Sequence, residues 1–154
     1  MHMIVPGVRE RRSVDRQLTD FFRTYGPRQF RSAIASISRF YRLRSPRVEW
    51  FEYLDWGKSG GRTFEDGKVA LVHPENWKKG RKYNSMRQWI HTVHHEMGHY
   101  LFWANAERKA DLFAAGMMRG IHAGNGKGTT RVRLTGTRRS VARRRAVPGR
   151  RASR

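Results

Sequence analysis

The sequence predicts an α+β domain, in which N-terminal helices precede a small antiparallel sheet and two further helices. Two kinds of pattern lead to this prediction. Apolar residues recur at helical spacing in residues 30–41 and again in 86–101. Between them, short runs rich in β-branched and aromatic residues are separated by glycine-containing turns, which is typical of a sheet. The length of 154 residues suits one domain with a modest core.

Two helices are expected first. One opens at Ser13-Val14-Asp15 and runs to about residue 24, because Gly26-Pro27 stops it. Pro27 suits the first position of the second helix, which ends before Ser45-Pro46. The apolar stripe of this second helix consists of Phe30, Ile34, Ile37 and Tyr41. Its exposed face carries Arg28, Arg31, Arg39 and Arg42, which we interpret as a solvated face.

Three short strands should follow, over residues 47–54, 61–64 and 68–73. A turn over residues 57–61 separates the first two, and Glu65-Asp66-Gly67 forms a hairpin turn between the last two. Pro74-Glu75-Asn76 ends the third strand. Local turns of this kind predict an antiparallel sheet.

An HExxH sequence, His95-Glu96-Met97-Gly98-His99, lies in the next helix. Ser85 and Gln88 form a capping-box pattern that starts this helix at Met86. The apolar stripe, opposite the histidines on a helical wheel, consists of Met86, Trp89, Ile90, Val93, Met97 and Leu101. Two histidines one turn apart can bind a single Zn²⁺, and Glu96 beside them can deprotonate a metal-bound water. The alternative is an inert His-rich helix.

A zinc site needs a third protein ligand, and the following helical stretch, residues 107–115, offers two carboxylates. Glu107 and Asp111 are one turn apart and share a face, which a tight turn near Asn105 would bring back toward His99. We expect Glu107 to be the third ligand and Asp111 to fix the tautomer of a ligating histidine. The reverse assignment stays open, as does an acidic first turn favoured only by the helix dipole. Gly98 is expected to leave room near the metal.

These two stretches, HHEMGHYLFW and ERKADLFAAGMM, resemble the motifs of the gluzincin-type zincin metallopeptidases. The second is similar to the motif of HtpX-type and ImmA/IrrE-type enzymes, and the resemblance covers about residues 47–118. It implies a zincin-like fold, in which an HExxH active-site helix is followed by a second ligand helix. It also implies His95, His99 and Glu107 as zinc ligands and Glu96 as general base. Asp111 would then be a carboxylate that orients a ligating histidine. In that fold the strand before the active-site helix forms the cleft's edge and binds extended substrate, a part that residues 69–73 would take.

Several other residues near these motifs have candidate roles. His91, one turn before His95, is a candidate fourth or alternative ligand, although a cleft-lining or surface position is commoner. His94 lies toward the apolar stripe and is expected to be a hydrogen-bonded core residue. Tyr83 or His122 would suit the oxyanion of a tetrahedral intermediate, and the sequence does not select between them. Core positions are expected for Trp77, Trp89 and Trp103.

The net charge of +21 is concentrated at the C-terminus, where residues 124–154 hold ten Arg and one Lys but no Asp or Glu. We therefore divide the chain into a metallopeptidase domain, 1–123, and a basic tail, 124–154, disordered when unbound. Arginine-rich segments bind polyanions by counterion release, which makes DNA or RNA the expected partner. Without a base-reading motif, that binding should be independent of sequence. The candidate nucleic-acid contacts are Arg131, Arg133, Arg138, Arg139, Arg143, Arg144, Arg145, Arg150 and Arg151.

Cysteine, a signal peptide and an apolar run of membrane-spanning length are all missing from the sequence. We therefore expect a location in the cytoplasm or within a nucleoprotein particle, without membrane association. The main functional hypothesis is a zinc-dependent metallopeptidase whose basic tail associates with nucleic acid. A second is a structural component of a virion or ribonucleoprotein particle, with a zincin-like fold and no turnover. A third is a metal-dependent hydrolase of a non-peptide bond.

Overall fold

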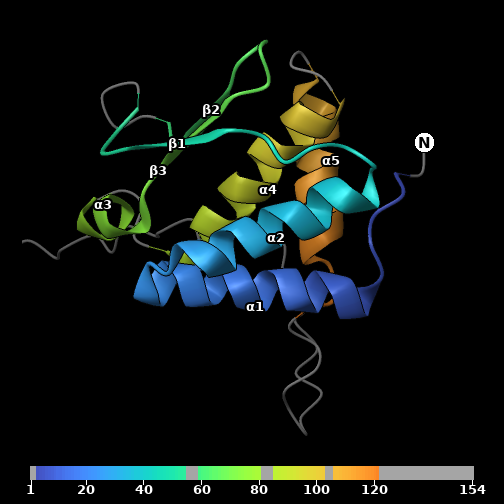
Figure 1. Ribbon diagram of the computed structural model, residues 1–154, viewed down its shortest axis with the longest axis horizontal. Coiled ribbons are helices and arrows are strands. Elements are labelled where there is room, and N and C mark those ends of the chain that lie inside the picture. The colour runs from blue at the N-terminus through green and yellow to red at the C-terminus, as the bar shows by residue number, and fades with distance from the viewer. Residues whose placement is uncertain (1–2, 55–58, 81–84, 103–105, 122–154) are drawn as a thin grey trace, which may run out of the picture.

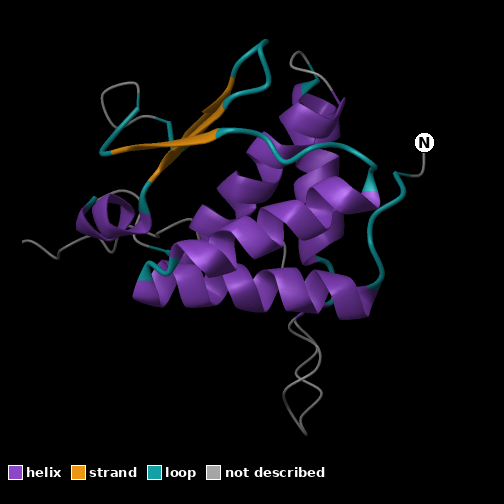
Figure 2. Ribbon diagram, in the orientation of Figure 1, coloured by secondary structure: helices purple, strands orange, loops and turns teal. Residues whose placement is uncertain are grey.

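A computed structural model describes residues 3–54, 59–80, 85–102 and 106–121, and over these ranges the fold is α+β, as predicted. Figures 1 and 2 show the helices packed together, with a small sheet beside them. The elements in order are α1 (Val8–Thr24), α2 (Pro27–Phe40), β1 (Val48–Phe51), β2 (Gly61–Thr63), β3 (Val69–Val72), α3 (Pro74–Lys79), α4 (Met86–Phe102) and α5 (Glu107–Met118).

The first two helices form a hairpin that crosses α4 and α5 (Figure 1). Helix α1 begins at Val8, five residues before the predicted start. The prediction was late because the N-cap, Gly7, has no side chain that would mark the helix start in the sequence. Ser13 therefore lies inside the helix. Tyr25 ends α1 in a left-handed conformation with φ of 59°. Helix α2 begins at Pro27 as predicted, and its arginines at 28, 31 and 39 are exposed.

The sheet is mixed, so the prediction of an antiparallel sheet was wrong. Its strand order is β1-β3-β2, with β2 antiparallel and β1 parallel to β3. The predicted hairpin joins β2 to β3 through a local turn. Strand β1 pairs with β3 although β2 lies between them in the sequence, so no turn signal sets the direction of β1. Because β3 is central and wholly buried, residues 69–73 do not form the cleft's edge. The edge strand that lies against α4 is β2.

Pro74 ends the third strand by opening a short helix, α3, which the sequence analysis did not predict. Pro74 occupies the first turn, where a missing N–H is tolerated. His73 is the N-cap, and its Nδ1 accepts a hydrogen bond from the backbone N–H of Glu75 at 3.2 Å. Histidine is not among the usual capping residues, so this helix start has no ordinary sequence signature.

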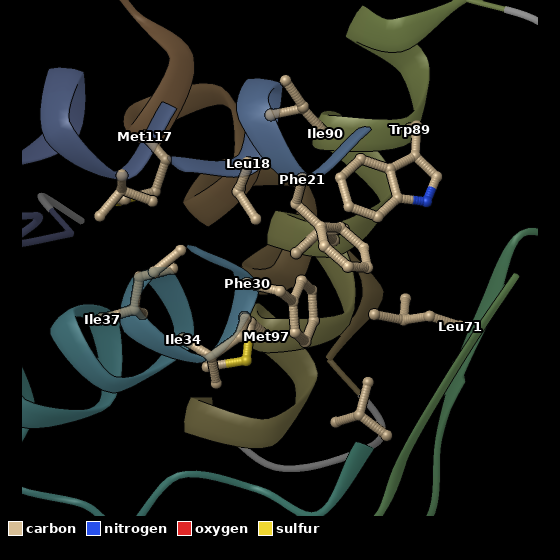
Figure 3. Packing of buried hydrophobic residues seen from close by; sticks show 14 of the residues in the cluster. Leu18, Phe21, Phe30, Ile34, Ile37, Leu71, Trp89, Ile90, Met97 and Met117 are labelled. Carbon is tan, nitrogen blue, oxygen red and sulfur yellow. The ribbon is translucent and has the colours of Figure 1, made fainter. Parts of the chain in front are cut away.

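The core lies where α1, α2, α4, α5 and β3 meet, and Figure 3 shows its aromatic and aliphatic side chains interdigitating. Trp89 is buried as predicted, and its indole N–H donates to the backbone oxygen of Val72 at 3.0 Å. Trp77 is also buried, and Trp103 lies outside the described residues. Each large side chain buried here contributes about 1.5–3 kcal/mol. The core therefore fixes one face of α4 and leaves the opposite face for His91, His95 and His99.

Helices α4 and α5 approach closely at Gly98. A Cβ atom at this position would lie 2.8 Å from the Cα atom of Ala110, so only glycine permits this packing distance. The space that the sequence analysis reserved for a metal beside Gly98 is thus filled by the backbone of α5. The far end of α5 is held by buried Arg11, whose guanidinium donates to the carbonyl oxygens of Gly116 at 3.1 Å and Arg119 at 2.5 Å. None of the described helices has the length and apolar character needed to cross a membrane.

Candidate metal centre

Helix α4 presents its histidines as the sequence pattern predicts. The hydroxyl of Ser85 accepts a hydrogen bond from the backbone N–H of Gln88 at 3.4 Å, which caps the helix start. The apolar stripe faces the core, where Trp89, Ile90, Val93 and Met97 are buried. His95 and His99 point away from the centre of that stripe, with side-chain exposures of 19% and 7%. The stripe therefore sets the direction of both imidazoles.

Three side chains converge at one point between α4 and α5. The Nε2 atoms of His95 and His99 are 3.1 Å apart, and the Glu107 carboxylate lies 3.2 Å from the first and 3.1 Å from the second. Ligands around a tetrahedral zinc, with bonds of about 2.0–2.1 Å, lie about 3.3–3.4 Å from one another. The observed spacing is therefore close to that of a zinc coordination shell. Within the described ranges, this is the one group of three such residues with metal-binding geometry.

Asp111 lies behind His95 rather than in this cluster. Its Oδ1 is 2.9 Å from His95 Nδ1. A carboxylate at this position holds the ring proton on Nδ1 and leaves the Nε2 lone pair free for a metal. The structure thus places Glu107 beside the Nε2 atoms of both histidines and Asp111 beside Nδ1 of His95.

The chemistry of the donor set fits a divalent metal ion. Two imidazole nitrogens and a carboxylate would direct their lone pairs at one another, a repulsive arrangement that a shared cation or proton relieves. Two histidines and a glutamate are also the donor set of one kind of catalytic zinc site, which keeps a fourth position open. The Glu107 side chain is 76% exposed, so the cluster is accessible from solvent. His99 differs from His95, because its Nδ1 is buried without a hydrogen-bond partner in the described part of the chain.

Glu96 lies under the edge strand β2 and is only 6% exposed. The hydroxyl of Thr63 donates to Glu96 Oε2 at 2.7 Å and also lies 3.0 Å from the backbone oxygen of Glu96. Burial raises the pKa of the Glu96 carboxyl, while the Thr63 hydrogen bond opposes this shift. Gly61 permits the close approach of β2, since a Cβ atom there would lie 2.6 Å from Glu96 Cγ. Sequence reasoning missed Thr63 and Gly61, because the contact of β2 with α4 leaves no local signal.

The remaining histidines of α4 do not join the cluster. His91 stacks near His95, with ring centroids 6.4 Å apart, but it contributes no atom to the three-residue group. His94 is 1% exposed, which confirms its expected core position. Contrary to the expectation that it is hydrogen-bonded, neither ring nitrogen of His94 has a partner among the described residues, and burial lowers its pKa to about 4. Tyr83, His122 and all the candidate arginines of residues 124–154 lie outside the described residues.

Comparison of the chain with protein-family models, with curated proteins and with solved structures finds no match. The two sequence motifs and the geometry of the cluster that they form are therefore the features that bear on function.

Proposed function

We propose that this chain is a zinc-dependent metallopeptidase of the gluzincin type with a zincin-like fold. Its zinc ligands are His95, His99 and Glu107. The observation that supports the proposal best is the convergence of their three ligand atoms at 3.1–3.2 Å, with Asp111 held on the far nitrogen of His95. A merely acidic first turn of α5 would not require a carboxylate between two imidazoles.

In this proposal, bound Zn²⁺ would polarise the scissile carbonyl and lower the pKa of a water molecule. Glu96 accepts a proton from the water that adds to the carbonyl carbon, and it returns this proton to the amine nitrogen as the C–N bond breaks. Thr63 holds the Glu96 carboxylate through the 2.7 Å hydrogen bond. An extended peptide that pairs with edge strand β2 would lie along α4, beside Glu96 and the cluster. In this proposal β2 takes the part that the sequence analysis gave to residues 69–73.

The test combines elemental analysis with a peptidase assay on the purified chain. We expect stoichiometric zinc, which is lost in His99→Ala and Glu107→Ala. Glu96→Gln should keep its zinc and its fold by circular dichroism but lose turnover of a quenched peptide library. Glu75→Gln, an exposed change of the same type on α3, is the matched control. Turnover that survives in Glu96→Gln, or after zinc removal, would refute the proposal.

A second candidate function is favoured by the charge of +11 over residues 124–154, which suits binding to DNA or RNA whether or not the domain turns over peptides. The change that tests it is the replacement of Arg143, Arg144 and Arg145 by glutamine. If all three contact phosphates, the slope of log affinity against log salt should fall by about 2–3. An unchanged slope would show that these arginines do not contact the polyanion.

A further inference from the structure

A second basic region lies on the folded domain, in residues 27–47. Residues 27–47 contain six arginines and no acidic residue, and all six are exposed. The acidic residue that follows this segment, Glu49 of β1, pairs with Lys68 at 3.5 Å, and Asp15 of α1 pairs with Arg87 of α4 at 2.9 Å. No ion pair within the described residues involves Arg28, Arg31, Arg39, Arg42, Arg44 or Arg47. Their charges are therefore free to bind an external anion.

The six arginines form two rows. Arg28, Arg31 and Arg39 are spaced three and eight residues apart on α2, so they lie on one face of that helix, opposite its buried stripe. The other three lie in residues 42–47, which run back from the end of α2 toward β1 (Figure 1). We refer to α2, residues 41–47 and β1 as the α2–β1 face. A nucleic-acid chain that lies on this face would therefore have exposed arginines of both segments within its reach.

A pocket of about 450 Å³ lies in this face, between α2 and β1. This volume falls within the range of about 300–1,000 Å³ for small-molecule sites. Its wall combines the Arg31 side chain with apolar and aromatic groups, among them Phe30, Pro46 and Trp50. Trp50 is 37% exposed, and its ring is held by an edge contact with Phe30 at a centroid distance of 4.7 Å. The pocket is thus a fixed aromatic surface beside an unpaired guanidinium.

From this juxtaposition we propose that the α2–β1 face binds single-stranded nucleic acid, with the arginine rows on its phosphates and a base in the pocket. Proteins that bind single strands combine a basic groove with aromatic side chains on which bases stack. A paired base in a duplex is enclosed by its neighbours and cannot enter such a pocket. The site is separate from the proposed zinc centre, and its binding does not depend on peptide hydrolysis.

The first test measures how much the arginines contribute to affinity. Binding of the full chain to a labelled oligothymidylate is followed by fluorescence anisotropy over a salt series. The site variant is Arg28→Gln/Arg31→Gln/Arg47→Gln. The matched control, Arg9→Gln/Arg12→Gln/Arg16→Gln, removes the same charge from exposed positions on α1. We expect the site variant to lower the slope of log affinity against log salt by about 2, at about 0.7 for each phosphate contact. Equal losses in the two variants would overturn the proposal.

The second test measures how much the bases contribute to affinity. An abasic strand of the same length keeps every phosphate, and wild-type protein should bind it at least about fivefold more weakly, because stacking contributes about 1–3 kcal/mol per base. Ala35→Phe, which fills the pocket without a change of charge, should bind both strands with the same lowered affinity. Equal wild-type affinity for the abasic strand or for a duplex would overturn the proposal. An acidic peptide that competes as well as the oligonucleotide would overturn it too, and would identify a protein partner.

Discussion

The packing of Gly98 against Ala110 predicts that Gly98→Ala will damage the proposed metal centre without changing a proposed ligand. The new Cβ atom would lie 2.8 Å from Ala110 Cα and 3.3 Å from its carbonyl oxygen. Carbon atoms in contact are about 3.5–4.0 Å apart, so the overlap is about 0.7–1.2 Å. A helix backbone cannot rotate out of the way as a side chain can. Helix α5 must therefore move away from α4 by a similar distance.

Glu107 and Asp111 flank Ala110 on α5, so both carboxylates move with it. The contact of Glu107 with His99, now 3.1 Å, would lengthen to about 4 Å, beyond the spacing that zinc bonds of about 2.0–2.1 Å allow. We expect zinc affinity to fall by about tenfold or more, comparable to the loss of a group that supports a ligand. The overlap should also destabilise the fold by about 1–3 kcal/mol, offset by about 1 kcal/mol of helix propensity.

The assay is competition for zinc with a chromophoric chelator, together with urea unfolding in the presence of a metal chelator. Gly116→Ala is the matched control, because it makes the same change on α5 where the nearest neighbour is Val5 Cγ1 at 3.0 Å. Val5 can adjust its side chain, so this variant should keep wild-type zinc affinity. If Gly98→Ala bound zinc as tightly as wild type with undiminished stability, the packing argument would be refuted.

Three further predictions concern the groups around the centre. Asp111→Asn should weaken zinc binding about 10–100-fold, because the amide no longer holds the His95 proton as a carboxylate does; unchanged affinity in the chelator competition would contradict this. His94 has a folded-state pKa of about 4, so the unfolded chain takes up its proton first as pH falls. Metal-free protein should therefore lose about 3 kcal/mol of stability between about pH 6.5 and 4, a loss that His94→Leu should abolish in urea unfolding at each pH. Arg11→Met should cost about 2–3 kcal/mol by leaving carbonyl oxygens at the end of α5 without a charged donor, whereas exposed Arg12→Met should leave the unfolding midpoint unchanged.

The clustering of His95, His99 and Glu107 could be anticipated from the sequence because its signals are local. The capping pattern at Ser85 and the apolar stripe fix the start and rotation of α4, and helical spacing then places His95 and His99 together. The position of Glu107 follows from its place at the start of the very next helix. Spacing alone, however, could not choose between Glu107 and Asp111, since both lie on one face. That choice depends on how closely α5 approaches α4, which Gly98 sets.

The parts of the fold that were missed depend on contacts between distant segments or on unusual caps. No local turn in the sequence predicts the parallel pairing of β1 with β3. This pairing makes the sheet mixed rather than antiparallel. Gly7 and His73 begin helices without a common capping side chain, so α1 was placed too late and α3 was not predicted. The contact of Thr63 with Glu96 links residues 33 positions apart, through a strand whose neighbour could not be known in advance.

The contacts within the cluster join residues that are close in the sequence, whereas the contacts that hold Glu96 and the end of α5 join distant ones. This difference in sequence separation affects the order of folding. His95 and Glu107 are twelve positions apart, so the α4–α5 pair can bring the ligand atoms together through short-range contacts. The Thr63 contact spans 33 positions and the Arg11 contact with Arg119 spans 108, so both require the closure of much longer loops. Zinc is therefore expected to bind before Glu96 is held in place. If the proposed centre binds zinc, a metal ion captured early would speed refolding, and it would be bound before β2 packs against Glu96.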